Sequence, residues 1–249
     1  MNEVIKTMLE HRSVRKFTSK ELTKDQIKQI VAAAQSASTS SFIQAYSIIG
    51  VTDKEKKKHL AELAGNQSYV ENNGHLFIFC ADLYRHQVAA EMEGKNVSAS
   101  LQTTEKFMVS VIDAALAAQN ASIAAESMGM GICYIGGLRN NLSEVCNELK
   151  TPEYIIPLFG LVVGYPDQQT EKKPRVPFNH IYHENEYEQD ASVYKKELAD
   201  YNEVISAYYK ERTGNTRSDT WTAQMANMLE GKSRLYMNEF VKSKKMNLR

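Results

Sequence analysis

The sequence predicts a β-sheet flanked by α-helices, in one large domain or two small ones. Segments with apolar residues at helical spacing alternate along the chain with short β-branched and aromatic runs of strand length. No internal repeat or low-complexity linker interrupts this alternation. The chain has 249 residues, of which 43% are hydrophobic and 24% charged, so it is long enough and apolar enough to bury a full core.

Two amphipathic helices are expected near the N-terminus. In the first, the apolar residues of segment 4–9 share one helical face, and the helix ends near His11. The second begins at Thr23, which forms a capping box with Gln26, and its apolar face continues to about Ala37.

A loop and two strands are expected next. Segment 36–41 is rich in serine and threonine, which favour turns over helix interiors, so it is predicted to be a loop with many hydroxyl donors. Tyr46–Val51 and Leu76–Ala81 are β-branched or aromatic runs of strand length. Between them, Asp53 can cap a helix that runs to about Ala64.

A long helix is predicted over about 100–128. Small side chains let another helix approach closely, so its many alanines predict a central position, with a subunit interface as the alternative. These alanines are Ala114, Ala115, Ala117, Ala118, Ala121, Ala124 and Ala125. Gly129 and Gly131 end the helix, and 132–135 forms a strand.

The rest of the chain is predicted to contain one more helix and one more strand before its composition changes after Lys172. A helix over 142–149 and a strand over 157–163 come first. The polar, tyrosine-rich segment that follows carries helical stretches near 194–210 and 219–240. Because it has few aliphatic residues, it is expected to wrap around another part of the protein.

Composition excludes several classes of partner. Lys+Arg and Asp+Glu both number 30, so the net charge of zero predicts no nucleic-acid partner, and any anion site must be local. No unbroken apolar run reaches the roughly 18–20 residues that span a bilayer, and the N-terminus lacks the apolar segment of a signal peptide, so no membrane is expected. Cys80, Cys133 and Cys146 are an odd, widely spaced set, which favours free thiols and a cytoplasmic location.

The segment His11-Arg12-Ser13-Val14-Arg15 is the first candidate for chemistry. Arginine is the side chain best suited to bidentate capture of phosphate, and the serine hydroxyl adds a donor. The segment therefore indicates either an anion site or a surface charge cluster at a helix end.

Three further loops carry the same kind of ambiguity. Gly129-Met130-Gly131 fails as a dinucleotide fingerprint, because Tyr134 stands at the sixth place; Gly136-Gly137 could let a planar ligand or a phosphate approach the backbone, or could be a turn. The loop 172–177 offers lysine and arginine between prolines, and 211–217 offers Arg212 and Arg217 in a Gly/Asn/Thr-rich loop. Either can be a solvated turn or an anion clamp.

Standard catalytic motifs are missing from the sequence. It has no Walker loop, no G-x-S-x-G elbow and no H-E-x-x-H. His180 and His183 have no cysteine or acidic companions at metal-ligand spacing, so no metal site is predicted. Asp82, Asp113 and Glu126 lie in apolar stretches and are expected to make structural hydrogen bonds.

In combination, these segments closely resemble the NADPH-dependent, FMN-containing nitroreductase and flavin reductase family. The matching motifs extend over essentially the whole chain: H-R-S-V-R at 11–15, S-T-S-S-F at 38–42, G-N-Q-S-Y at 65–69, A-A-E-S-M-G-M-G at 124–131, Y-I-G-G-L-R-N at 134–140, P-L-F-G at 157–160 and K-P-R at 173–175. The resemblance implies an α+β fold with a mixed central sheet wrapped by helices. It also implies one domain over 1–249 and an intertwined homodimer. The C-terminal extension, about 180–249, would wrap around this dimer.

The resemblance also implies which residues hold the cofactor. Those expected to contact FMN are His11, Arg12, Ser13, Arg15, Thr39, Gln67, Ser68, Tyr69, Tyr134, Ile135, Gly136, Gly137, Lys173 and Arg175. Within that set, 11–15 would grip the phosphate and ribityl chain, helped by Lys173 and Arg175. Some relatives carry serine where this chain has Thr39, and the hydroxyl is kept.

The same resemblance implies where the co-substrates bind. Thr39–Phe42 of the partner subunit would line the open face of the flavin, so Ser41 and Phe42 are expected to contact substrate. Arg212 and Arg217 would clamp the 2′-phosphate of NADPH.

The implied activity is an NADPH oxidoreductase that uses bound FMN. Two electrons would pass from NADPH to small-molecule acceptors (nitroaromatics, free flavin, quinones or similar compounds) by a ping-pong mechanism. No catalytic side chain is expected, because the cofactor performs the chemistry and the protein supplies placement and charge. The alternatives are a non-catalytic protein that binds or delivers flavin, and another enzyme on the same fold, such as a dehalogenase or an enoate reductase.

Overall fold

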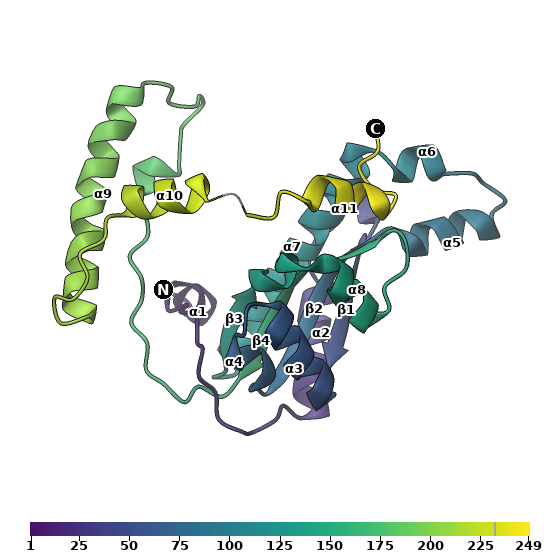
Figure 1. Cartoon of the computed structure of the whole chain (residues 1–249), viewed down its shortest axis with the longest axis horizontal. Helices are drawn as coiled ribbons and strands as arrows, with labels where there is room; N and C mark the ends of the chain where they lie inside the picture. The colour runs from purple at the N-terminus through teal and green to yellow at the C-terminus, as the bar shows by residue number, and fades with distance from the viewer. Residues whose placement is uncertain (232) are drawn as a thin grey trace. The chain divides into compact units, whose positions relative to one another are not determined.

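The computed structural model describes residues 1–231 and 233–249 and divides into two compact units. The large unit comprises 1–170 and 234–249, and the small unit comprises 171–233 (Figure 1). The sequence predicts a single domain with an extension from about residue 180. In the structure the small unit begins at residue 171, and the last segment of the chain is part of the large unit.

The large unit is built on one four-stranded sheet with the order β1-β2-β4-β3. Its strands are β1 Tyr46–Val51, β2 His75–Asp82, β3 Gly131–Ile135 and β4 Ile155–Gly164. All four strands predicted from the sequence are present, and all three pairings between them are antiparallel. The parallel component expected of a mixed sheet is limited, among the described residues, to a bridge between Ser13 and Ile132.

The helices of the large unit are α1 Glu3–Leu9, α2 Lys24–Gln35, η1 Ser40–Phe42, α3 Lys54–Leu63, α4 Ser68–Glu71, α5 Tyr84–Met92, α6 Ser98–Leu101, α7 Thr104–Ser127, η2 Gly136–Asn140, α8 Leu142–Leu149 and α11 Met237–Ser243. The predicted capping box of Thr23 and Gln26 is present at the start of α2. The long helix starts later than predicted, at residue 104, because the Thr103 side chain caps it by accepting from the backbone N–H of Lys106. Helix α5 was not predicted, since its apolar residues form no stripe.

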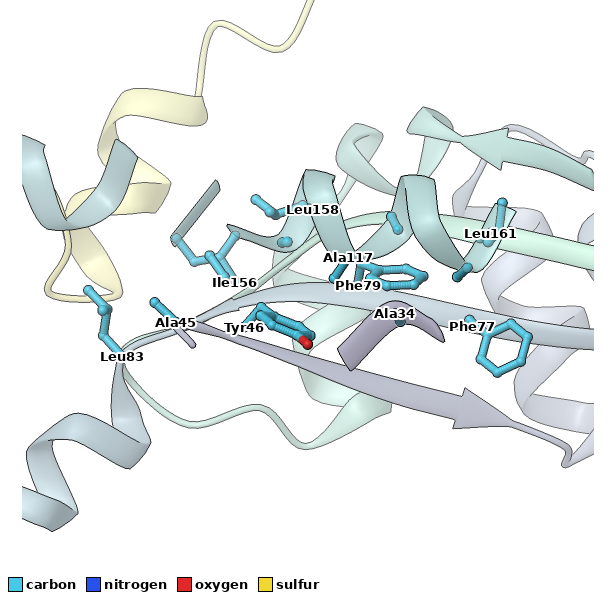
Figure 2. Close-up of a cluster of buried hydrophobic side chains, with 14 of the residues drawn as sticks. Ala34, Ala45, Tyr46, Phe77, Phe79, Leu83, Ala117, Ile156, Leu158 and Leu161 are labelled. Carbon is cyan, nitrogen blue, oxygen red and sulfur yellow. The ribbon is translucent and has the colours of Figure 1, made fainter. Parts of the chain in front are cut away.

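Both faces of the sheet are covered. On β2, Phe77, Phe79 and Ala81 face the core formed with α2 and α7, while Leu76, Ile78 and Cys80 face the core formed with α3 and part of α8. Every residue of β2 is buried, as expected of a strand covered on both sides. Figure 2 shows Phe79 beside Ala117 of α7, and both side chains are fully buried. The result is an α+β fold with the sheet in the middle layer.

Helix α7 is the central helix of the large unit. It packs against α2 and contacts all four strands, and its buried alanines belong to the core between them. Its length and composition would allow it to cross a membrane, although polar residues are interspersed along it and it contains no unbroken apolar run of spanning length. In this fold 44% of its most apolar 18-residue stretch is buried. These contacts identify α7 as a core helix, as the alanine pattern predicts.

The small unit contains η3 Phe178–His180, α9 Ala191–Arg212 and α10 Trp221–Glu230. Its own small core consists of Tyr201, Ile205 and Tyr209. The predicted helix over 194–210 is confirmed, but the one over 219–240 is wrong. The helix stops at Glu230 before Gly231, and α11 is a separate helix of the large unit.

The start of β2 contains a buried histidine, His75. His75 is 5% exposed, its Nε2 has no partner among the described residues, and its ring centroid lies 4.3 Å from that of Phe77. Burial, together with the charge of Lys57, lowers the pKa of His75 from 6.5 to about 4. The native protein therefore holds His75 neutral.

We expect this histidine to make the fold acid-sensitive. The unfolded chain binds a proton at His75 as the pH falls below 6.5, whereas the native chain binds it only near pH 4. The free energy of unfolding should therefore fall by about 3 kcal/mol over that interval. Urea unfolding at several pH values would measure this, with His75→Gln showing a flatter dependence. Identical slopes for both proteins would mean that His75 is protonated in the native state.

Candidate functional site

The segment 11–15 lies along the edge of the sheet at β3. The backbone N–H of Val14 donates to the carbonyl of Ile132 at 2.9 Å, and Ser13 pairs with Ile132 in the parallel bridge. Val14 is buried, and a Cβ on Gly131 would lie 2.6 Å from its Cγ2. The sequence explains Gly131 as a helix stop; the structure adds that the glycine gives Val14 room to dock.

Docking of Val14 directs its polar neighbours to different places. His11 Nδ1 lies 2.7 Å from Glu126 Oε1 on α7. Arg12 lines a pocket of about 290 Å³ with residues of α1 and the end of α7. Both Arg12 and Arg15 are exposed, and among the described residues neither has a carboxylate partner. No carboxylate among the described residues neutralises either guanidinium, so both can attract an anion.

Arg15 lies in a polar cluster with Ser13, Tyr69 and Cys133. Burial raises the pKa of Tyr69, and a hydrogen bond to Arg15 opposes that rise. The pKa of Cys133 is also raised by burial, against the charge of Arg15 and hydrogen bonds to Ser13 and Arg15. The Tyr69 hydroxyl donates to Gln67 Oε1 at 2.8 Å. The sequence predicts only that Cys133 is a buried thiol. Its place beside 13–15 follows from the bridge between Ser13 and Ile132, the neighbouring residue on β3.

The turn after β3 closes the other side of this cluster. A Cβ on Gly137 would lie 2.4 Å from the Ala64 carbonyl oxygen and 3.1 Å from Gln67 Nε2. The backbone at Gly137 therefore packs directly on the segment that carries Gln67, Ser68 and Tyr69. Buried Ile135 pairs with Gly160 in the sheet and fixes where this turn begins. The structure thus brings 11–15, 67–69 and 134–137 together in one cluster, and their role as cofactor contacts stays a prediction.

Tyr134 is the partly exposed side chain of the strand end. It is 37% exposed and packs edge-on against Phe159, with ring centroids 5.6 Å apart. Its hydroxyl donates to Gln119 Oε1 of α7 at 3.4 Å. Burial of the hydroxyl end raises the pKa of Tyr134 to about 12, so the phenol stays protonated at neutral pH.

The predicted substrate loop lies on another part of the large unit. Thr39 precedes η1, and Ser41 and Phe42 have φ angles of 48° and 59°. Phe42 is 82% exposed. Among the described residues no hydrogen bond joins Thr39–Phe42 to 11–15 of the same chain.

Lys173, Arg175, Arg212 and Arg217 all belong to the small unit. The Lys173 Nζ and the Arg217 guanidinium lie 5.4 and 4.4 Å from the centroid of the Tyr209 ring. Burial raises the pKa of Tyr209, but hydrogen bonding and charge from Lys173, with further help from Arg217, lower it overall. Arg212 donates to the Tyr208 hydroxyl at 2.9 Å, and Arg217 pairs with Asp219 at 2.8 Å.

The described residues contain no group of three His, Cys, Asp or Glu side chains placed to hold a metal ion. The three cysteines are free and buried, as the sequence predicts. Glu126 is one of the three acidic residues for which the sequence predicts structural hydrogen bonds. Its contact with His11 puts it at the edge of the cluster. The arrangement can bind an anionic ligand, and its polar groups form no nucleophile–base pair.

Comparison with known proteins decides the family. The model of the nitroreductase family matches residues 8–165, and that of the nitroreductase family, C-terminal domain, matches residues 173–249. The chain belongs to the nitroreductase family. The boundary between the two matches coincides closely with the start of the small unit at residue 171. The resemblance seen in the sequence motifs is therefore confirmed.

Among nitroreductase-family relatives, the chain is 56% identical to an FMN reductase (NADPH) from Bacillus subtilis, over 99% of each protein. Of the solved structures, B. megaterium NfrA1 is 62% identical with a TM-score of 0.98, covering 99% of this chain and 100% of that one. An NADPH:FMN oxidoreductase from Vibrio harveyi, complexed with NAD+, is 38% identical with a TM-score of 0.89 over the whole of both chains. These similarities confirm the predicted fold.

Proposed function

We propose that this protein is an NADPH-dependent oxidoreductase that uses bound FMN to reduce small organic acceptors. The observation that carries the proposal is the polar cluster around Arg15, which offers a guanidinium without a carboxylate partner among the described residues beside a tightly packed glycine turn. The B. subtilis relative named FMN reductase (NADPH) supports the same activity. We place the protein in the cytoplasm, where its three free thiols would stay reduced.

The donor set of the cluster fits FMN. Arg12, Arg15 and Ser13 supply the charge-assisted and hydroxyl donors that a phosphate needs, with His11 oriented by Glu126. Gln67, Ser68 and Tyr69 would contact the flavin from one side, and the backbone of 134–137 from the other. Lys173 and Arg175, which the family resemblance also names for the phosphate, belong to the small unit, and their role stays a prediction.

FMN, when bound, supplies the chemistry, because it accepts a hydride from NADPH and passes two electrons to the acceptor. The chain's own residues would hold the cofactor, and we propose that they leave one face of the flavin open. We propose that NADPH and the acceptor use that face in turn, which is a ping-pong order. Initial-rate lines should run parallel, and intersecting lines would contradict the shared face.

We also propose that the protein is a homodimer. Met108, Ile112 and Leu116 form an exposed apolar stripe along α7, and the apolar residues of α1 are exposed as well. Such stripes are typical of surfaces that another subunit covers. Thr39–Phe42 would then reach the flavin of the partner subunit.

Anaerobic reduction is the decisive experiment. The purified protein should carry flavin, and its visible absorbance should bleach when NADPH is added without oxygen. A nitroaromatic, a quinone and free FMN should then each be tested for reoxidation. A yellow protein that keeps its colour with NADPH would instead be a flavin-binding or flavin-delivery protein.

The basic loop of the small unit allows a separate prediction about co-substrate choice. Arg212 has no carboxylate partner among the described residues, so its guanidinium can bind the 2′-phosphate that distinguishes NADPH from NADH. Arg212→Ala should raise the KM for NADPH about tenfold and leave the KM for NADH nearly unchanged. Steady-state kinetics with both nucleotides would measure this, with exposed Lys195→Ala on α9 as the control. Equal effects on both nucleotides would remove Arg212 from the phosphate site.

A further inference from the structure

The loop before β1 holds an unusual backbone conformation. Ser41, Phe42 and Gln44 have φ angles of 48°, 59° and 52°, in the left-handed region that residues other than glycine seldom adopt. Phe42 is 82% exposed, so burial of its ring does not stabilise this conformation. Such a backbone persists only where surrounding contacts fix it.

Asp113 of α7 supplies the first of these contacts. Its side chain is fully buried, and its two carboxylate oxygens accept from the backbone N–H groups of Ser40 at 3.1 Å and Ala45 at 3.0 Å. These two amides stand at either end of the left-handed stretch. A buried carboxylate is costly unless it is hydrogen-bonded, and both hydrogen bonds of Asp113 go to this loop.

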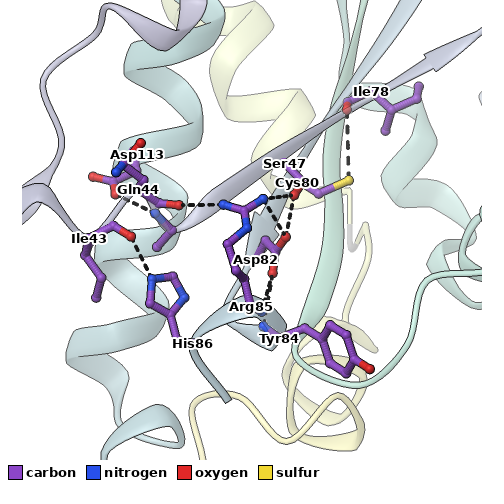
Figure 3. Close-up of polar contacts among 11 residues, drawn as sticks. Ile43, Gln44, Ser47, Ile78, Cys80, Asp82, Tyr84, Arg85, His86 and Asp113 are labelled. Atoms are coloured by element: carbon purple, nitrogen blue, oxygen red, sulfur yellow. Dashed lines mark hydrogen bonds and ion pairs between the residues drawn. The ribbon is translucent and has the colours of Figure 1, made fainter. Parts of the chain in front are cut away.

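Helix α5 supplies the second set of contacts. His86 Nε2 lies 2.6 Å from the Ile43 carbonyl oxygen, and Arg85 Nη1 donates to the Gln44 carbonyl at 3.4 Å. Arg85 also donates to Ser47 Oγ at 3.1 Å, and its Nη2 lies 3.7 Å from buried Asp82. Figure 3 shows these side chains converging on Ile43 and Gln44 from α5, with Asp113 on α7.

We propose that Asp113 is a positioning residue for acceptor selection, because it holds Ser41 and Phe42 in the conformation in which they line the partner subunit's open flavin face. This inference rests on the proposed function. An exposed phenyl ring held in one orientation can stack on a planar aromatic acceptor such as a nitroaromatic or a flavin. The same ring held loosely would lose that preference, because ordering it would cost free energy on binding.

Asp113→Asn is the test of the conformational part. The amide keeps the size of the side chain but has one acceptor oxygen in place of two, so one loop N–H would face an NH₂ group. Hydrogen exchange of the peptide that contains Ser40 and Ala45 should become at least tenfold faster. Asn120→Ala is the matched control, since Asn120 lies on the same helix and donates to the Ala33 carbonyl, away from the loop. Unchanged exchange in Asp113→Asn would overturn the proposal.

Acceptor selectivity tests the functional part. We expect the ratio of kcat/KM for a nitroaromatic to that for ferricyanide, which needs no stacking, to fall about tenfold in Asp113→Asn. Phe42→Ala should lower the same ratio, and adding Asp113→Asn to Phe42→Ala should lower it little further. Additive losses would mean that Asp113 acts by general destabilisation, and would overturn the proposal.

A second variant covers the case in which Asp113→Asn does not fold. His86→Phe keeps a ring of similar size and removes only the contact with Ile43, since Nδ1 of His86 has no partner among the described residues. It should shift selectivity in the same direction. If the wild-type protein is bleached by NADPH but neither variant changes the ratio, the positioning role fails while the proposed function stands. A wild-type protein that is not bleached would instead refute the proposed function.

Discussion

Arg15→Ala should release the flavin. Arg15 is the guanidinium that reaches Tyr69 and Cys133, and it is exposed and without a carboxylate partner in the described structure. If Arg15 binds the phosphate as proposed, its removal would delete charge-assisted hydrogen bonds, so the Kd for FMN should rise roughly 10- to 100-fold. Flavin absorbance per mole of protein after dialysis, followed by titration with FMN, would measure the loss.

Lys16→Ala is the matched control for Arg15. The two residues are neighbours, and both are exposed and cationic, but Lys16 pairs with Asp167 at 3.0 Å. Its removal should leave the flavin content unchanged. If Arg15→Ala retained as much flavin as Lys16→Ala, Arg15 would have no place in the phosphate site.

Gly137→Ala should disturb both the fold and the flavin site. The added methyl group would stand 2.4 Å from a backbone carbonyl oxygen, which cannot move aside as a flexible side chain can. Overpacking of this kind costs about 1–3 kcal/mol, which corresponds to a fall in Tm of roughly 2–12 °C for a protein of this size. The shift of η2 away from Gln67 should also lower the affinity for FMN.

Gly136→Ala provides the comparison for stability. The three atoms nearest to a Cβ at Gly136 would all belong to the guanidinium of Arg139, the closest at 3.2 Å, and the end of a side chain can adjust more easily than backbone. Its Tm should therefore change by less than about 2 °C. Thermal unfolding of both apoproteins would separate the two, and equal shifts would mean that the backbone at Gly137 yields to the clash.

The local elements were predictable because their signals lie within a few residues of each other. The capping box at Thr23 and the strand Tyr46–Val51 stand where short-range pattern puts them. The division of 219–240 into two helices was not predicted: the first helix stops before Gly231, and the chain from residue 234 onward belongs to the large unit. Propensity is a local quantity, and unit boundaries depend on long-range packing.

The candidate site shows the same division. The residue types of 11–15 and the glycines at 136 and 137 point to an anion and a close approach without any structure. The partners of those residues did not follow from the sequence: the contact between His11 and Glu126 joins positions 115 residues apart. Segment 36–41 is predictable as a loop, but the left-handed backbone at Ser41, Phe42 and Gln44 is not, because contacts from α5 and α7 fix it.

The sequence by itself determined the family and most of the secondary structure, and it predicts the chemical character of the site, because these depend on residue type and short-range spacing. Only the tertiary structure decided that Val14 docks in the space left by Gly131, that Gly137 packs on Ala64, and that Asp113 holds both ends of the loop before β1. Each of these contacts joins residues far apart in the chain. Their distances are set by how the helices pack on the sheet, and no local pattern encodes that packing.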